Sequence, residues 1–162
     1  MHKDDKKTDI KAAYGALAKK YKLPAYDVLN HEFEIETLED TAFLLRNIRT
    51  KISEKMEFCI KLLASILQPE QNITDLQECK MFNDDQKKKM YLLYKNLMAA
   101  MRSTGVLSMS STEKEEASFL TAFSAEWSGK NGYRDQLKAV LKTLKESWTK
   151  ETDVEAELGY LG

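Results

Sequence analysis

The chain has 162 residues, of which 43% are hydrophobic and 31% are charged, and it contains only six glycines and two prolines. This length and composition favour one domain with a proper core, built from helices with long solvated faces rather than from short strands. The formal net charge of −1 excludes a strong overall attraction to polyanions or to basic partners, so binding to nucleic acid or to a membrane needs a local patch.

The N-terminal residues predict a helical hairpin. Thr8-Asp9 is a helix-start pattern, and the apolar residues that follow recur with helical period up to Tyr21. The first helix is expected to end before Pro24, because the residue preceding a proline avoids the helical region. A short second helix follows, up to about residue 35. Residues 1–35 are therefore predicted to form an N-terminal hairpin or arm. It either caps the bundle or is swapped onto another chain.

The middle of the chain predicts one long helix over residues 37–67. Thr37 and Asp40 have the spacing of a capping box, and Gln68-Pro69 ends the pattern. Between them, aliphatic and thiol side chains recur at a strict seven-residue spacing: Leu38, Leu45, Ile52, Cys59 and Ile66. A helix of this length typically forms the spine of a bundle or the seam of a dimer, and the apolar face is wider than a dimer seam requires.

Three further start signals predict the later helices. The pairs with capping-box spacing are Thr74 with Gln77, Asn83 with Gln86, and Thr112 with Glu115. The second of these helices is expected to close at Gly105, ahead of a serine-rich loop over residues 106–111.

The last helix, over residues 133–150, follows a turn with two glycines. Its apolar face is expected to include Leu141 and Trp148, with Trp148 joining a core cluster of Phe119, Phe123, Trp127 and Tyr133. Tyr91 and Tyr94, on the predicted helix 84–103, are likewise assigned to the core.

These elements predict an all-α fold. We expect a single helical bundle, residues 36–150, in which the helices 84–103, 113–128 and 133–150 pack against the 37–67 helix. The remaining residues, 151–162, form an acidic and hydrophobic C-terminal tail with at most one helical turn.

Charge alternates in blocks along the chain, for example six acids and no base over residues 23–45. One interpretation is internal pairing of the blocks, helped by acids early in helices and bases late. The other leaves some basic faces free for a partner. Two stripes at helical spacing are candidate phosphate-binding residues: Lys88, Lys95 and Arg102 on one helix, and Arg134, Lys138, Lys142 and Lys145 on another.

The tail supplies the candidate partner-binding residues. They are four apolar side chains set among acids: Val154, Leu158, Tyr160 and Leu161. Such a segment either docks back on the basic 133–150 helix or becomes ordered on contact with a partner.

No catalytic, cofactor or metal site is predicted. The sequence has no Gly-x-Ser-x-Gly elbow and no phosphate-binding glycine loop, and His31 has no second histidine at ligand spacing. A helix-turn-helix over residues 18–34 is disfavoured as a DNA reader, because its second helix would present exposed carboxylates, Glu32 among them, to a polyanion.

A cytoplasmic protein is expected. No stretch approaches the ~18 uninterrupted apolar residues of a membrane span, and the charged start of the chain is unlike a secretory signal. Cys59 and Cys79 are predicted to be buried, reduced thiols.

The composition and motifs favour a non-enzymatic interaction or assembly protein whose partner is another protein or a second copy of itself. The alternative is an accessory protein that binds RNA or the ribosome through the basic stripes. A second alternative is an enzyme with a site that the sequence does not reveal.

Overall fold

The computed structural model describes residues 2–161, and the side chains of residues 9–159. Regular structure in this part of the chain is entirely helical. The elements are α1 (His2–Tyr21), α2 (Tyr26–Phe33), the 3-10 turn η1 (Ile35–Thr37), α3 (Leu44–Leu67), α4 (Ile73–Cys79), α5 (Asp84–Met109), α6 (Glu113–Ser128), α7 (Tyr133–Trp148) and α8 (Val154–Leu161).

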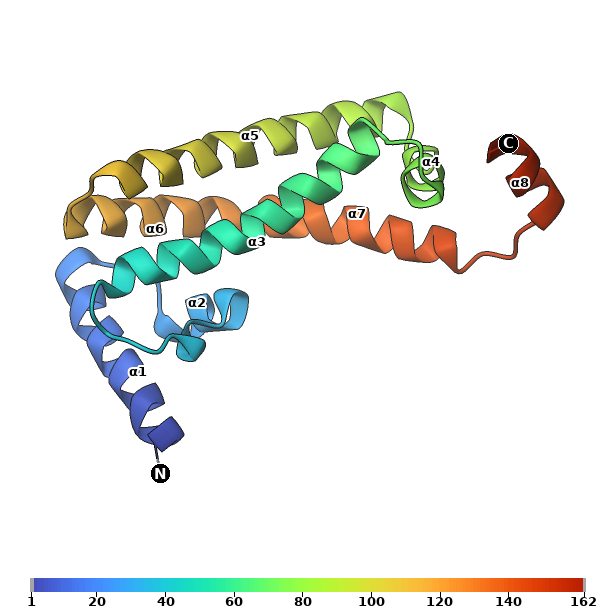
Figure 1. Cartoon of the computed structure of the whole chain (residues 1–162). Coiled ribbons are helices and arrows are strands. Elements are labelled where there is room, and N and C mark those ends of the chain that lie inside the picture. The colour runs from blue at the N-terminus through green and yellow to red at the C-terminus, as the bar shows by residue number, and fades with distance from the viewer. Residues whose placement is uncertain (1, 162) are drawn as a thin grey trace.

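The helices form one elongated bundle (Figure 1). The central helix α3 crosses its middle, with α5 along one side and the consecutive helices α6 and α7 along the other. The hairpin of α1 and α2 lies beside the first half of α3, while α4 and α8 lie at the opposite end. We call that opposite end the distal end: α4, the first half of α5, the second half of α7, and α8. The predicted all-α bundle around one long helix, with an N-terminal hairpin, is confirmed.

The core follows the apolar face of α3. Ile48, Ile52, Met56, Leu63 and Ile66 are fully buried there. Burying a side chain of this size contributes about 1.5–3 kcal/mol. Because α3 supplies such residues along its whole length, the other helices pack around it. The apolar residues at seven-residue spacing are therefore covered within one chain.

The start of α3 was predicted wrongly. The helix begins at Leu44, and Leu38 lies in extended backbone. The two residues assigned to a capping box serve local turns instead: the Thr37 hydroxyl donates to the Glu34 carbonyl at 2.7 Å, and the Asp40 carboxylate accepts from the Ala42 amide at 2.9 Å. Short polar side chains readily bond nearby backbone in this way, which competes with helix formation.

Of the three capping boxes predicted for the later helices, two are present. Both reciprocal hydrogen bonds of a capping box form between Asn83 and Gln86 and between Thr112 and Glu115. The third prediction, Thr74 with Gln77, is wrong. The N-cap of α4 is Asn72, whose side chain accepts from the backbone of residue 75 at 2.8 Å.

α5 continues past its predicted end. Gly105 lies inside the helix, and most of the predicted loop over 106–111 is its last turn. Ser108 donates its hydroxyl to the Thr104 carbonyl at 2.9 Å, and Arg49 of α3 donates to both residues. The final turn is therefore held by a side chain from another helix, which local sequence does not reveal.

Both ends of the chain are more helical than predicted. α1 begins at His2 rather than near residue 8, and the tail contains the eight-residue α8 instead of at most one turn. An Asp153 carboxylate oxygen accepts from the Ala156 amide at 3.2 Å, which satisfies one of the free donors at the start of α8.

A buried ion pair fixes the end of the bundle that lies near α1. Arg49 of α3 binds Glu116 of α6 through two nitrogens at 2.7 and 3.1 Å, and both side chains are 4% exposed. Ser111 adds a hydroxyl donor to the same carboxylate at 2.6 Å. This bidentate contact sets how α6 approaches α3, since a pair this deeply buried tolerates little displacement.

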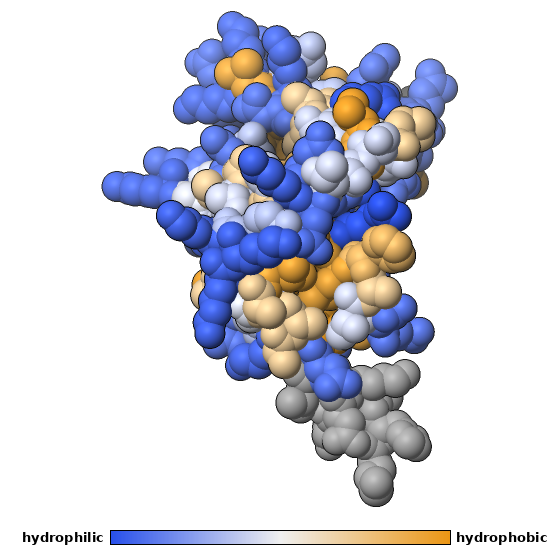
Figure 2. Space-filling view, turned by 90° about the vertical axis from the view of Figure 1, so that its left-hand side faces the viewer, coloured by the Kyte–Doolittle hydropathy of each residue, from blue (hydrophilic) through white to orange (hydrophobic). Residues whose placement is uncertain are grey.

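Figure 2 shows the side of the molecule nearest the α5–α6 turn. Most of this face is hydrophilic, and a hydrophobic area occupies its lower half. The half-buried residues Ala13, Leu17 and Ala18 of α1 pack against the core at the same end. Among the helices described, none combines the length and apolar character needed to cross a membrane.

Candidate functional site

A buried acidic residue joins the hairpin to three helices of the bundle. Glu32 of α2 is buried; its carboxylate accepts from the Trp127 indole at 2.8 Å and from Arg134, and its carbonyl accepts from Lys55. Burial alone raises the pKa of this carboxyl. The hydrogen bonds from Trp127 and Arg134, with the positive charges of Arg134 and Lys55, outweigh burial, so the pKa lies below its usual value. The expectation that Glu32 is an exposed acid is wrong.

The distal end carries most of the exposed large hydrophobic side chains. Twelve such residues stand out over the described side chains, and seven of them belong to distal-end elements. These seven are Ile73, Tyr91, Leu92, Leu141, Trp148, Val154 and Leu158. Apolar residues gathered at one end of a molecule are more typical of an interaction surface than apolar residues scattered singly.

One face of α7 alternates between cationic and apolar residues. Lys138, Leu141, Lys145 and Trp148 follow one another at spacings of three, four and three, which places them along one side of the helix. Lys142 flanks the same side. We call these five residues the α7 strip. Leu141 is 41% exposed and Trp148 50% exposed, although both were predicted to lie in the core.

The α7 strip is anchored at its far end. The Trp148 indole donates to the Glu78 carboxylate of α4 at 3.2 Å, which orients the ring while leaving half of it open to solvent. Leu137, Val140 and Leu144, on the adjacent face of α7, are buried in the core. The strip is therefore a fixed surface on a packed helix.

The lysines of the strip lack internal partners among the residues described. Lys138, Lys142 and Lys145 are exposed, and no described carboxylate lies within 4 Å of their ammonium groups. Arg134, predicted to belong to the same stripe, has a different setting. It pairs with Glu32 and lies 3.6 Å from Asp135.

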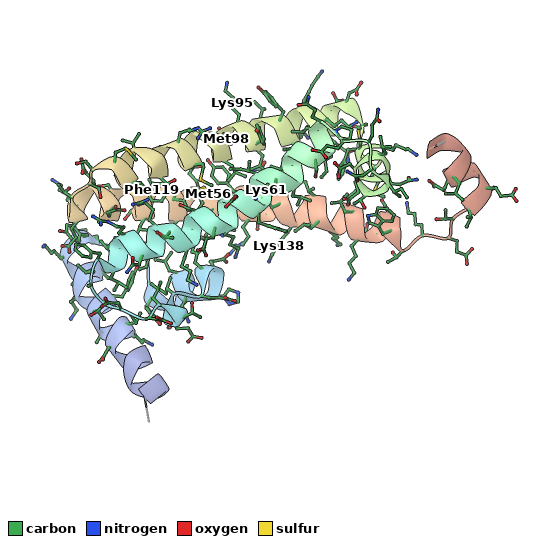
Figure 3. The ribbon with its side chains drawn as sticks, in the orientation of Figure 1. Met56, Lys61, Lys95, Met98, Phe119 and Lys138 are labelled. Atoms are coloured by element: carbon green, nitrogen blue, oxygen red, sulfur yellow. The ribbon has the colours of Figure 1, made fainter. Side chains whose placement is uncertain are left out.

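The second predicted stripe lies elsewhere. Lys88, Lys95 and Arg102 are exposed along α5, and they too have no ion-pair partner in the described part of the chain. Figure 3 shows Lys95 on the outer edge of α5 and Lys138 on the opposite edge of the molecule, below α7. The fold therefore separates the two basic stripes instead of joining them into one surface.

Internal pairing does account for part of the charge pattern. Lys11 pairs with Asp27 at 3.5 Å, and Lys20 with Glu113 at 3.2 Å, each joining a basic block to an acidic one. Hydrogen bonds from Tyr21 and Lys20 lower the pKa of the Glu113 carboxyl. Acidic and basic blocks thus pair around the hairpin, whereas the basic stripes of α5 and α7 include exposed cations without described partners.

An open apolar groove separates α5 from α7. Its walls include Phe82, Met90 and Leu93 on one side and Ala139 and Val140 on the other, and its volume is about 210 Å³. That is below the ~300–1,000 Å³ typical of small-molecule sites. A cofactor or drug-sized ligand would not be enclosed here.

The candidate tail residues lie on α8. Val154 and Leu158 are exposed, at 63% and 59%, and share one face of the helix. The side chains of Tyr160 and Leu161 lie outside the described residues. In Figure 1, α8 follows the end of α7 after a five-residue connection, residues 149–153, and does not run along it.

Among the residues whose side chains are described, the titratable groups outside these surfaces form no metal-ligating cluster. Across the described side chains, no three His, Cys, Asp or Glu residues are grouped so that they could hold a metal ion. Cys59 is buried, and burial raises its thiol pKa to about 11, which keeps it protonated. Cys79 is half-buried, with the Lys87 ammonium 3.3 Å from its sulfur.

Three surface residues were assigned to the core because the predicted apolar faces of their helices were too wide. On α7, Leu137, Val140 and Leu144 already complete a core-facing stripe, and Leu141 and Trp148 lie roughly 100° around the helix from Val140. Tyr91 was also assigned to the core, yet it is exposed and stacks on Tyr94 with ring centroids 6.4 Å apart. The sequence did contain a signal that separates the two sets: the angular position of each residue around its helix, measured from the most apolar residue.

The chain matches no protein-family model, and no curated protein sequence or solved structure gives a significant match.

Proposed function

We propose that this chain is a non-enzymatic interaction protein whose α7 strip binds an acidic amphipathic helix of a protein partner. The observation that carries the proposal is the alternation of exposed lysines with Leu141 and Trp148 on one fixed helix face. Apolar residues supply buried area on contact, and flanking charges set orientation and exclude wrong partners. A half-exposed tryptophan at the end of such a face is a typical binding anchor.

The setting supports a protein partner over a small ligand. The α7 strip is a surface rather than an enclosed pocket, and helix recognition uses apolar anchors spaced along one face. Both cysteines are free thiols. This fits the reducing environment of the cytoplasm, where we place the protein.

A homodimer through α3 is disfavoured by burial. The apolar line of α3 is covered within one chain, with Ile52 and Ile66 fully buried, so a second copy would have to use another surface.

RNA binding remains the alternative, and the exposed cations of α5 favour it. Lys88, Lys95 and Arg102 are spaced seven residues apart, about 10.5 Å along the helix. Because the α5 and α7 stripes lie on opposite edges (Figure 3), only one of them could contact a given phosphate backbone. A few contacts of this kind give weak and salt-sensitive binding.

Affinity capture from native lysate with charge-reversed variants separates these functions. One variant carries Lys138→Glu, Lys142→Glu and Lys145→Glu; its matched control carries Lys88→Glu, Lys95→Glu and Arg102→Glu. We expect a bound protein that resists nuclease, is lost with the α7 variant and is retained with the α5 variant. Nuclease-sensitive capture, lost with the α5 variant, would instead establish RNA binding.

A further inference from the structure

We infer that α8 docks on the α7 strip of its own chain and competes with the partner for that surface. The inference rests on the proposed function, because it assigns the regulation of the same site. In the structure α8 is undocked, with Val154 and Leu158 exposed. The undocked arrangement leaves the strip open to a partner, and docking closes it.

The apolar faces of the two helices match in length. α8 has eight residues, and its exposed apolar residues Val154 and Leu158 are spaced four apart on one face of the helix. Eight helical residues span about 12 Å, and Leu141 to Trp148 on α7 spans about 10.5 Å. An antiparallel α8 therefore covers both apolar residues of the strip and extends little beyond them.

The charges of the two helices are complementary. Residues 151–162 contain four acids and no base: Glu151, Asp153, Glu155 and Glu157. Glu155 and Glu157 flank the apolar face of α8 on its two sides, since they lie one residue after Val154 and one before Leu158. The α7 strip presents three exposed lysines without an ion-pair partner among the described residues. Docking pairs these charges beside the apolar contact.

The connection allows the helix to fold back. Residues 149–153 form a five-residue linker, which reaches up to ~17 Å when extended. Two packed helices need only ~8–10 Å between their axes. A linker this short also gives a local concentration of α8 in the millimolar range, so even a weak contact is substantially populated.

Acrylamide quenching of tryptophan fluorescence tests the docking directly on the full chain. The chain has two tryptophans: Trp127 is 3% exposed and Trp148 50% exposed, so quenching reports mainly on Trp148. We compare the unmodified chain with Leu158→Asp, and use Ala156→Asp as the matched control on the opposite face of α8. Docking predicts a quenching constant about twofold higher or more in Leu158→Asp, with Ala156→Asp close to the unmodified chain. Equal quenching in all three chains, or an equal rise in both variants, overturns the inference.

Dilution separates docking within a chain from docking between chains. Contact within one chain protects Trp148 equally at 1 and 100 µM, whereas protection that grows with concentration shows exchange between copies and overturns the assignment to the same chain. A synthetic peptide of residues 150–162, added to Leu158→Asp, should restore protection of Trp148. No restoration at millimolar peptide contradicts an α8 contact with the strip.

Partner capture then distinguishes failure of this inference from failure of the proposed function. If both hold, Leu158→Asp captures roughly two- to tenfold more partner than the unmodified chain, because the competitor is released. Equal capture together with protected Trp148 overturns competition. If no captured protein depends on the α7 strip, the proposed function is overturned. The quenching result still decides whether α8 docks.

Discussion

At the scale of single residues, Glu32 shows how one carboxylate joins distant segments. It receives hydrogen bonds from Trp127 of α6 and Arg134 of α7, while Lys55 of α3 binds its carbonyl. The Lys55 ammonium also lies 5.3 Å from the Phe33 ring centroid and 5.4 Å from that of Trp127. The hairpin is thus held by polar contacts as well as by apolar packing.

Replacing Glu32 with glutamine should lower the free energy of unfolding by about 2 kcal/mol at pH 7, because the Arg134 contact loses its charge. It should also reduce the loss of stability in acid. The folded-state pKa of Glu32 lies below its unfolded value, so its contribution is present above the unfolded pKa of about 4.5 and disappears as the pH falls through the folded pKa. Urea unfolding at pH 7 and in steps below pH 5 measures both effects. The exposed Glu34→Gln is the control, and an equally stable Glu32→Gln would contradict this role.

The Arg49–Glu116 pair should behave as a buried unit. Glu116→Ala leaves the guanidinium buried without its partner and should cost about 3–5 kcal/mol. The double variant Arg49→Met with Glu116→Leu should recover most of that loss, since it removes both charges. Denaturant unfolding of the single and double variants, with the exposed Glu54→Ala as a control, checks this. A double variant no more stable than Glu116→Ala would show that the pair is not an isolated electrostatic unit.

At the scale of helices, a boundary is predictable from sequence when its signal lies within a few neighbouring residues. The capping boxes at Asn83 and Thr112 were recognisable because both partners lie within four residues. The end of α5 depends on Arg49, more than 50 residues away, and the start of α3 depends on Phe43 taking a left-handed backbone with φ 51°. Boundaries set by such tertiary or strained contacts leave no local signal.

The central line of α3 should not tolerate a charge. Ile52→Asp places an unpaired carboxylate at a fully buried position and should unfold the chain. Phe58→Asp on the same helix is the matched control, because Phe58 is 61% exposed. Far-UV circular dichroism and thermal melts compare the two. A folded Ile52→Asp protein would mean that this face is not the core.

The α7 lysines should matter little for folding. Lys138→Glu, Lys142→Glu and Lys145→Glu alter exposed residues without described ion-pair partners, so the melting temperature should shift by no more than about 2 °C per substitution. Thermal unfolding in moderate salt measures this. A much larger loss would indicate that the lysines pair internally, as charge blocks elsewhere in the chain do.

At the scale of the whole molecule, the fold was predictable and the candidate site only in part. The seven-residue line and the scarcity of glycine and proline predict a helical bundle, because burial of a continuous apolar face dominates folding. The site depends on which helix faces remain uncovered. Sequence indicated the lysines, whereas Leu141 and Trp148 were assigned to the core because the apolar face of this helix was taken to be wider than it is.

Photo-crosslinking tests the binding role of the α7 strip most directly. A benzophenone amino acid replaces Leu141, in a chain that carries Leu158→Asp to keep α8 away, and a second chain carries it at the exposed Leu92 of α5. We predict a protein adduct at position 141 that survives nuclease treatment and is absent at position 92. Adducts at position 92 alone, or an adduct at 141 that nuclease removes, would contradict a protein-binding surface on α7.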